Sequence, residues 1–149
     1  MSTEETGPDP TLPRVQMAFA CEGISTDTFQ RVSFNAVIED LAAPHFPTQT
    51  VQFFAIFGFE ANIPHIFSRV KVIVEGPGGS KIGEQPLPDI AFTSDRYKAR
   101  LICGFPGITW PAPGRYTIKL TTGDRTFASF SVNVHQVIQL QPQPPPSPG

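Results

Sequence analysis

The sequence predicts an all-β protein with one immunoglobulin-like antiparallel β-sandwich of seven or eight strands. Apolar residues alternate with polar or small ones in many short runs, which is the periodicity of half-buried strands. Seventeen Pro and twelve Gly in 149 residues separate these runs with turns. No long segment has the 3.6-residue period and the capping residues of a helix, and the sequence contains no internal repeat.

We expect one folded domain, at residues 14–140. The leader before it, residues 1–13, is acidic and almost without large apolar side chains, so we expect it to be disordered. It has neither the basic nor the apolar region of a signal peptide. The tail at 141–149, QPQPPPSPG, is expected to be extended and polyproline-like. It has no flanking Arg or Lys to orient it in an SH3-like groove, which favours a solvated end over a recognised ligand.

The alternation predicts a series of strands in chain order. Residues 23–28 and 39–48 are expected to be a turn and a loop, and Pro86 and Pro88 should keep their stretch irregular or at a sheet edge. The expected strands are 15–21, 32–38, 51–60, 70–74, 97–105, 116–120 and 128–134, with short additions at 81–82 and 137–140.

The last two of the main strands form a predicted hairpin within residues 110–134. Gly114 permits the positive φ of a tight corner. Tyr116 is placed to form a tyrosine corner, in which its hydroxyl bonds upstream backbone. The immunoglobulin signature itself is absent, because Trp110 follows both Cys residues and Ile118 stands where a second Cys would be.

The segment VQFFAIFGFE, at 51–60, carries apolar groups on both of its faces. A strand of this kind is expected to be covered on both sides. Phe54 and Ile56, on the second face, pack under a loop or tail in one interpretation. In the other they are an interface to a partner or a second copy of the chain, although two residues make a small patch for that purpose.

Four stretches of the sequence resemble a family of small uncharacterised bacterial proteins, described only as a domain of unknown function. The stretches are RVQMAFACEGISTD, RVSFNAVIEDLAAPHFP, SRVKVIVEGPGGSKIGE and FPGITWPAPGRYTIKL, and the likeness covers about residues 14–134. The resemblance implies a small bacterial β-sandwich. It brings no known catalytic or ligand-binding residues.

Charge and cysteine content narrow the classes of function. A net charge of −2 and a pI near 5.9 provide no basic field for nucleic acid, and no apolar run is long enough for a membrane helix. Without an export signal, Cys21 and Cys103 are expected to be buried, reduced thiols. We therefore expect a cytoplasmic protein that binds neither nucleic acid nor membrane.

No catalytic, cofactor or metal site is predicted. The three histidines, His45, His65 and His135, lie far apart in sequence, and neither HExxH nor CxxC occurs. The glycine-rich stretch 76–81 contains Pro77 and is not followed by a helix, so it is a turn and not a phosphate loop. No GxSxG elbow surrounds a serine.

Three hypotheses of function remain. The leading one is a non-enzymatic protein-interaction module that binds a protein partner or itself. The second is a small-ligand or carbohydrate-binding sandwich using the loop residues His45, Phe46 and Trp110; an exposed Trp110 would favour it, and a buried Trp110 would count against it. The third is a hydrolase, which requires His45 or His135 beside a nucleophile.

Overall fold

The computed structural model describes residues 13–50 and 52–137, and these form thirteen strands and no helix. The described part of the chain therefore contains no helix that could cross a membrane. The expected leader lies outside the described residues except for Pro13, and the Pro-rich tail lies outside them altogether. The strands are β1 (Arg14–Thr26), β2 (Val32–Ile38), β3 (Asp40–Ala43), β4 (Thr48–Gln49), β5 (Phe53–Glu60), β6 (His65–Phe67), β7 (Val70–Glu75), β8 (Lys81–Leu87), β9 (Ile90–Phe92), β10 (Lys98–Phe105), β11 (Thr109–Trp110), β12 (Gly114–Thr122) and β13 (Arg125–Gln136).

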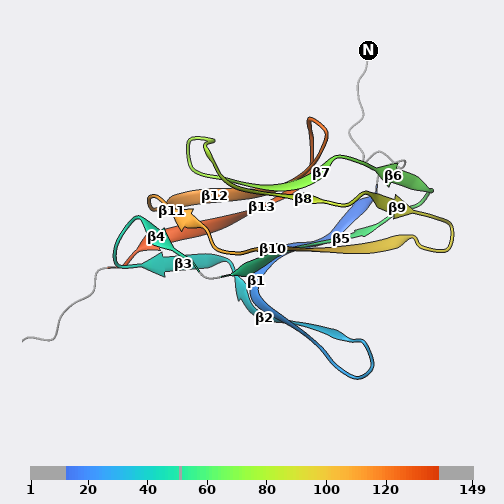
Figure 1. The fold of residues 1–149 in the computed structure, drawn as a ribbon, viewed down its shortest axis with the longest axis horizontal. Coiled ribbons are helices and arrows are strands. Elements are labelled where there is room, and N and C mark those ends of the chain that lie inside the picture. Colours follow the sequence, from blue (N-terminus) through green and yellow to red (C-terminus); the bar gives the residue numbers. More distant parts are fainter. Residues whose placement is uncertain (1–12, 51, 138–149) are drawn as a thin grey trace, which may run out of the picture.

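Two sheets form the layers of a sandwich (Figure 1). The first has the order β10-β5-β1-β2 and the second the order β3-β13-β12-β7-β8. All of these neighbours are antiparallel except β3 and β13, which run parallel. Two further pairs, β4 with β11 and β6 with β9, lie at opposite ends of the sandwich (Figure 1).

The strand order is that of an immunoglobulin-like sandwich, which confirms the predicted fold class, although the described residues form thirteen strands and not the expected seven or eight. In such sandwiches the first sheet contains strands A, B and E and the second contains C, F and G. Here β1, β5 and β10 stand at the places of A, B and E, and β7, β12 and β13 at those of C, F and G. The additional β8 extends the second sheet beside β7.

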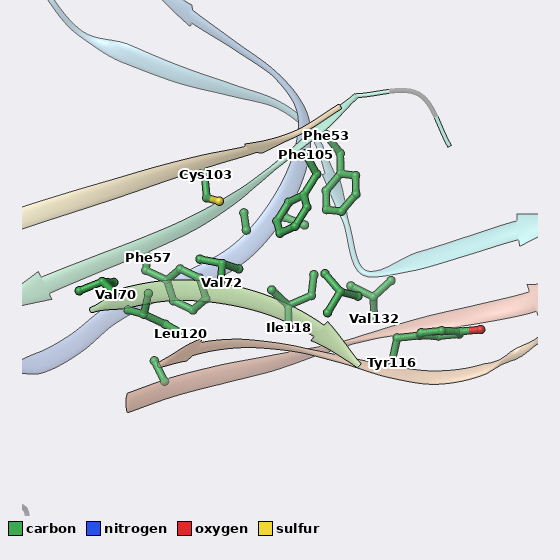
Figure 2. Packing of buried hydrophobic residues seen from close by; sticks show 14 of the residues in the cluster. Phe53, Phe57, Val70, Val72, Cys103, Phe105, Tyr116, Ile118, Leu120 and Val132 are labelled. Atoms are coloured by element: carbon green, nitrogen blue, oxygen red, sulfur yellow. The ribbon is translucent and has the colours of Figure 1, made fainter. Parts of the chain in front are cut away.

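The core lies between the inner faces of the two sheets. Phe57 and Phe105 from the first sheet point toward Val72 and Ile118 from the second (Figure 2). Each of these four side chains is fully buried or nearly so. Large rigid rings fill much of this space, including a Phe53–Phe105 stack with ring centroids 5.1 Å apart.

The predicted corner at the start of β12 is present. The Tyr116 hydroxyl donates to the carbonyl oxygen of Ala112 at 2.6 Å, and it accepts from the N–H of Ala112 at 3.3 Å. Gly114 has a φ of 150°, and a Cβ at this position would lie 2.4 Å from Cγ of Pro77. The corner therefore requires a glycine for both conformation and space.

Several expectations for the individual elements need correction. Residues 23–26 are not a turn, because β1 stays paired with β2 until Thr26 faces Val32. The expected loop at 39–48 contains β3, which finds a partner in β13, a strand far along the chain. Pro86 lies within β8, but β8 is the edge of its sheet, as its proline content indicates.

Beyond the body of the sandwich, β1 and β2 continue as a projecting hairpin (Figure 1). The hairpin turns away from the first sheet near Gly23, and in this region Ala36 of β2 has a φ of 56°. The Phe34 ring on the hairpin meets Phe19 edge-on at 5.0 Å, and the Arg100 guanidinium of β10 lies over the Phe34 ring at 5.7 Å. These contacts join Phe34, near the base of the hairpin, to the outer face of the first sheet.

Candidate functional site

Trp110 is buried, with a relative exposure of 1%. Its indole Nε1–H donates to Oγ1 of Thr50 at 3.1 Å, and its ring packs edge-on against Tyr116 at 4.9 Å. Pairing of β11 with β4 fixes the backbone on either side of this contact. The hypothesis that Trp110 is an exposed binding aromatic is therefore wrong, because this indole belongs to the core.

The other two predicted loop residues do not make a binding surface with Trp110. Phe46 is half-buried and packs against the core, while His45 is exposed beside it. Next to Trp110 a narrow cavity of about 30 Å³ is lined mainly by apolar side chains from both sheets, including Phe53, Ile118 and Val132, and also by the polar residues Glu22, Thr50 and Gln52. This volume admits about one water molecule and no sugar ring.

Ile56 is also covered within the monomer, with no exposed surface. Its direct cross-strand neighbours are Phe19 on β1 and Ile102 on β10, and Phe34 of the hairpin packs on Phe19. Phe54 is half-buried, with its ring against Gly104, where a Cβ would lie 3.3 Å from a ring carbon. The interface predicted through Ile56 is therefore wrong, and the interpretation of a covered outer face is the better one.

The three histidines do not converge. His65 lies on β6, at the end of the sandwich opposite β3, where its ring packs on Phe67 at 4.4 Å (Figure 1). His135 Nε2 lies 3.2 Å from Oδ1 of Asp40, and both side chains are 59% exposed. Among the described residues, no hydrogen bond joins His135 to Ser, Thr or Cys, and no group of three ligands could hold a metal ion.

Both cysteines are buried and unpaired. Cys21 faces Phe54 and Cys103 faces Ala55 across the ladder, so their side chains lie on opposite faces of the sheet. Burial raises the pKa of the Cys103 thiol to about 11, and burial also raises the pKa of Cys21. Neither thiol is a ready nucleophile, because the thiolate is the reactive form.

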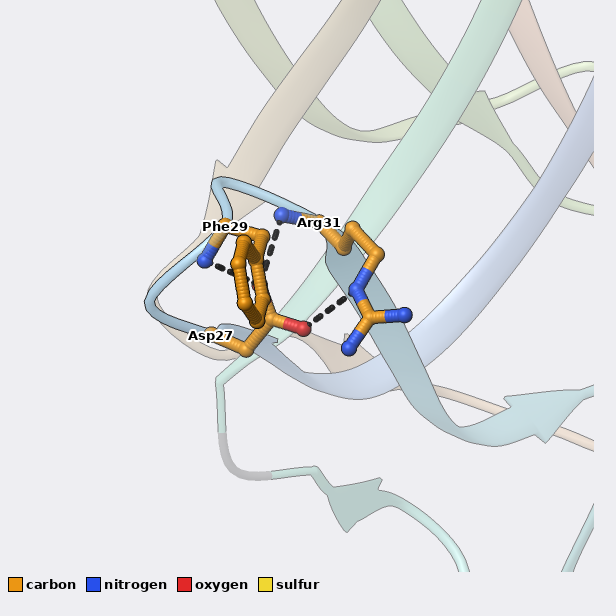
Figure 3. Close-up of polar contacts among 3 residues, drawn as sticks. All are labelled: Asp27, Phe29 and Arg31. Carbon is orange, nitrogen blue, oxygen red and sulfur yellow. Dashed lines mark hydrogen bonds and ion pairs between the residues drawn. The ribbon is translucent and has the colours of Figure 1, made fainter.

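The most exposed large apolar side chain among the described residues is Phe29, with a relative exposure of 77%. It stands at the tip of the β1–β2 hairpin, in the five-residue turn Asp27–Arg31 (Figure 3). Backbone hydrogen bonds close this turn from the N–H of Asp27 to the carbonyl of Arg31 at 3.0 Å and from the N–H of Gln30 to the carbonyl of Asp27 at 3.1 Å. Gln30 adopts a positive φ of 64°, which allows the chain to reverse.

The Asp27 carboxylate organises the turn from within. Its Oδ1 accepts the backbone N–H of Phe29 at 2.8 Å and that of Arg31 at 2.9 Å, and its Oδ2 accepts Nε of Arg31 at 2.6 Å (Figure 3). Hydrogen bonds from Arg31 and Phe29 lower the pKa of Asp27, and the bond from the Arg31 backbone N–H has the largest effect. Carboxylates bonded in this way are typical of Asx turns, which fix a local backbone conformation.

Arg31 also contacts the exposed ring. Its guanidinium carbon lies 5.4 Å from the centroid of the Phe29 ring, within the range of a cation–π contact. The tip therefore presents an aromatic ring and a cation in one arrangement held by Asp27. The sequence carried a signal for this turn, an Asp two residues before an aromatic and four before an Arg, but the predicted turn at 23–28 was placed too early to include Phe29.

Comparison with known proteins adds a fold likeness only. No family model matches the sequence, and no curated protein is similar to it. Among solved structures, an immunoglobulin-like protein from Pseudomonas aeruginosa is similar, with 10% identity and a TM-score of 0.38. The match covers 85% of this chain and 99% of the other. The resemblance to a family of uncharacterised bacterial proteins thus gains no sequence support.

Proposed function

We propose that this protein is a non-enzymatic interaction module that binds a protein partner through the tip of the β1–β2 hairpin. The observation that carries the proposal is the exposed Phe29 ring, 77% exposed on a turn fixed by the Asp27 carboxylate. A single exposed apolar side chain is common on protein surfaces, so the proposal depends on the fixed turn, which holds the Phe29 ring and the Arg31 guanidinium together in one preorganised arrangement.

The chemistry of the tip suits a protein partner. Aromatic residues and arginine are enriched among the residues that dominate binding energy at interfaces, and Phe29 and Arg31 provide one of each. Because Asp27 already orders the turn, binding loses little conformational entropy there. The partner expected is a protein with an apolar pocket and an acidic group beside it, within reach of Arg31.

Catalysis and ligand binding have less support. The His135–Asp40 pair is exposed, and the hydrogen bonds of the described residues give it no nucleophile. The aromatic Trp110 that a carbohydrate site would use is in the core. Two buried thiols without a disulfide support a cytoplasmic location as part of the proposal.

The test is capture of partners from a lysate of the source organism, followed by titration calorimetry with the purified partner. Replacing Phe29 with Ser is expected to weaken binding by about 2 kcal/mol, or roughly thirtyfold, as for a dominant interface residue. Ile66→Ser is the matched control, because Ile66 is 64% exposed on β6, away from the hairpin. Equal affinities of the wild type and the Phe29 variant would refute the proposal.

A further inference from the structure

The four edge strands of the two main sheets differ in how they are protected against pairing with another chain. Natural sheets protect edges with short strands, prolines, charges or irregular backbone. β3 has four residues, β8 contains Pro86, and β2 has Ala36 at a positive φ. β10 is the longest and most regular of the four edges: its eight residues pair with β5 in a continuous register, and it contains no proline. Its charged side chains, Lys98 and Arg100, lie in its first half, which leaves the half from Ile102 to Phe105 without a charge.

The outer face of β10 is exposed to solvent beside its unpaired edge. Its outward-facing residues, Lys98, Arg100, Ile102 and Gly104, are all exposed, and Ile102 is 40% exposed. The exposure of Gly104 is informative because a glycine has only backbone surface to show. Gly58, on the neighbouring central strand β5, is buried.

The topology explains why this edge is open. In the immunoglobulin sandwich, strand D lies beside strand E and covers its outer edge. The segment between β8 and β10 that would supply strand D is β9, which has three residues and pairs with β6. Within the described residues, β5 is the only strand that pairs with β10. The backbone donors and acceptors on the other side of β10 therefore have no strand to bond.

We propose that β10 pairs with β10 of a second copy of this chain, antiparallel about a two-fold axis at Ile102, so that the two first sheets join into one. A row of unpaired N–H and C=O groups at a sheet edge forms hydrogen bonds with another strand. The pairing is isologous and closes as a dimer. It goes beyond the hairpin function and uses a different surface, so each can fail without the other.

Side chains decide the register of this pairing. Directly opposed residues of an antiparallel pair lie on one face, so a two-fold axis at Ile102 sets the two exposed Ile102 side chains against each other. Arg100 then lies opposite Gly104, which has no charge and no side chain, and Pro106 limits the pairing because it lacks an N–H. An axis at Arg100 would instead oppose two guanidinium groups, which is destabilising.

The test measures mass by sedimentation equilibrium over a concentration series that reaches the millimolar range. The wild type is expected to approach twice its 16.3 kDa mass reversibly. Ile102→Lys and Ile102→Glu are each expected to weaken dimerisation by about tenfold or more, because like charges then face each other across the axis. An equimolar mixture of the two variants should recover a one-to-one dimer.

Val37→Lys is the matched control, since Val37 is 54% exposed on β2, at the other edge of the same sheet. It should dimerise like the wild type, and thermal unfolding should show that all three variants are folded. A wild type that stays at monomer mass would overturn the proposal, as would an Ile102→Lys variant that dimerises like the wild type. Tighter dimerisation of Ile102→Glu alone would place Ile102 opposite Arg100 and overturn the proposed axis.

Discussion

Replacing Tyr116 with Phe removes one oxygen from the core and leaves the ring in place. That oxygen donates to the carbonyl of Ala112 at 2.6 Å and accepts its N–H at 3.3 Å, and the Tyr116 side chain has no exposed surface. Both backbone groups of Ala112 lose a partner in the variant. Ala112 is exposed, so water can reach these groups, and a net hydrogen bond contributes about 1 kcal/mol; we therefore expect the free energy of unfolding to fall by about 1 kcal/mol.

For a chain of this length such a loss lowers the melting temperature by about 2–4 °C. Urea unfolding can be followed through the fluorescence of Trp110, the single tryptophan, which is buried 4.9 Å from the Tyr116 ring. Tyr97, the only other tyrosine, is 50% exposed and provides the control Tyr97→Phe, expected to change stability by less than about 0.5 kcal/mol. Equal stability of the two variants would show that the corner's hydrogen bonds contribute nothing net.

Three further outcomes are expected. Ile56→Ala should lose about 2–5 kcal/mol of unfolding free energy in urea because its site is fully buried; a loss below about 0.5 kcal/mol would mean that its cover opens in solution. Ala36→Gly should gain about 0.5 kcal/mol, since glycine accepts the φ of 56° without a Cβ penalty, and a loss would show that this φ is not kept. Thiol labelling near pH 8 should be slow for Cys21 and Cys103, whose pKa values are raised, and fast for two thiols in denaturant; rapid labelling of the native protein would contradict their burial.

Strands whose pattern is local could be predicted from the sequence. Residues 32–38 were expected as a strand and form β2 with those same bounds, because the alternation of Val32, Phe34 and Ile38 with polar or small residues requires no other part of the chain. The tyrosine corner was predictable for the same reason, since Gly114 and Tyr116 act within one short stretch.

Elements that depend on distant partners could not be predicted. The four residues of β3 have too little periodicity to be recognised, and they become a strand only because β13 offers its edge. The alternation of residues 51–60 is the same whether another part of the chain or a partner covers Ile56, so the sequence left both a covered face and an interface open. The hairpin that covers this face depends on a bend between Gly23 and Ala36, which no propensity specifies.

The parallel pairing of β3 with β13 also sets an order for synthesis. Asp40 at the start of β3 faces Asn133, close to the end of the described chain. While a ribosome makes the protein, β3 has left the exit tunnel long before its partner exists. The second sheet can close only after β13 has been made, and such long-range contacts slow folding. Nascent chains that stop before β13 would leave one edge of β12 unpaired, and an unpaired strand with an apolar row is prone to aggregate.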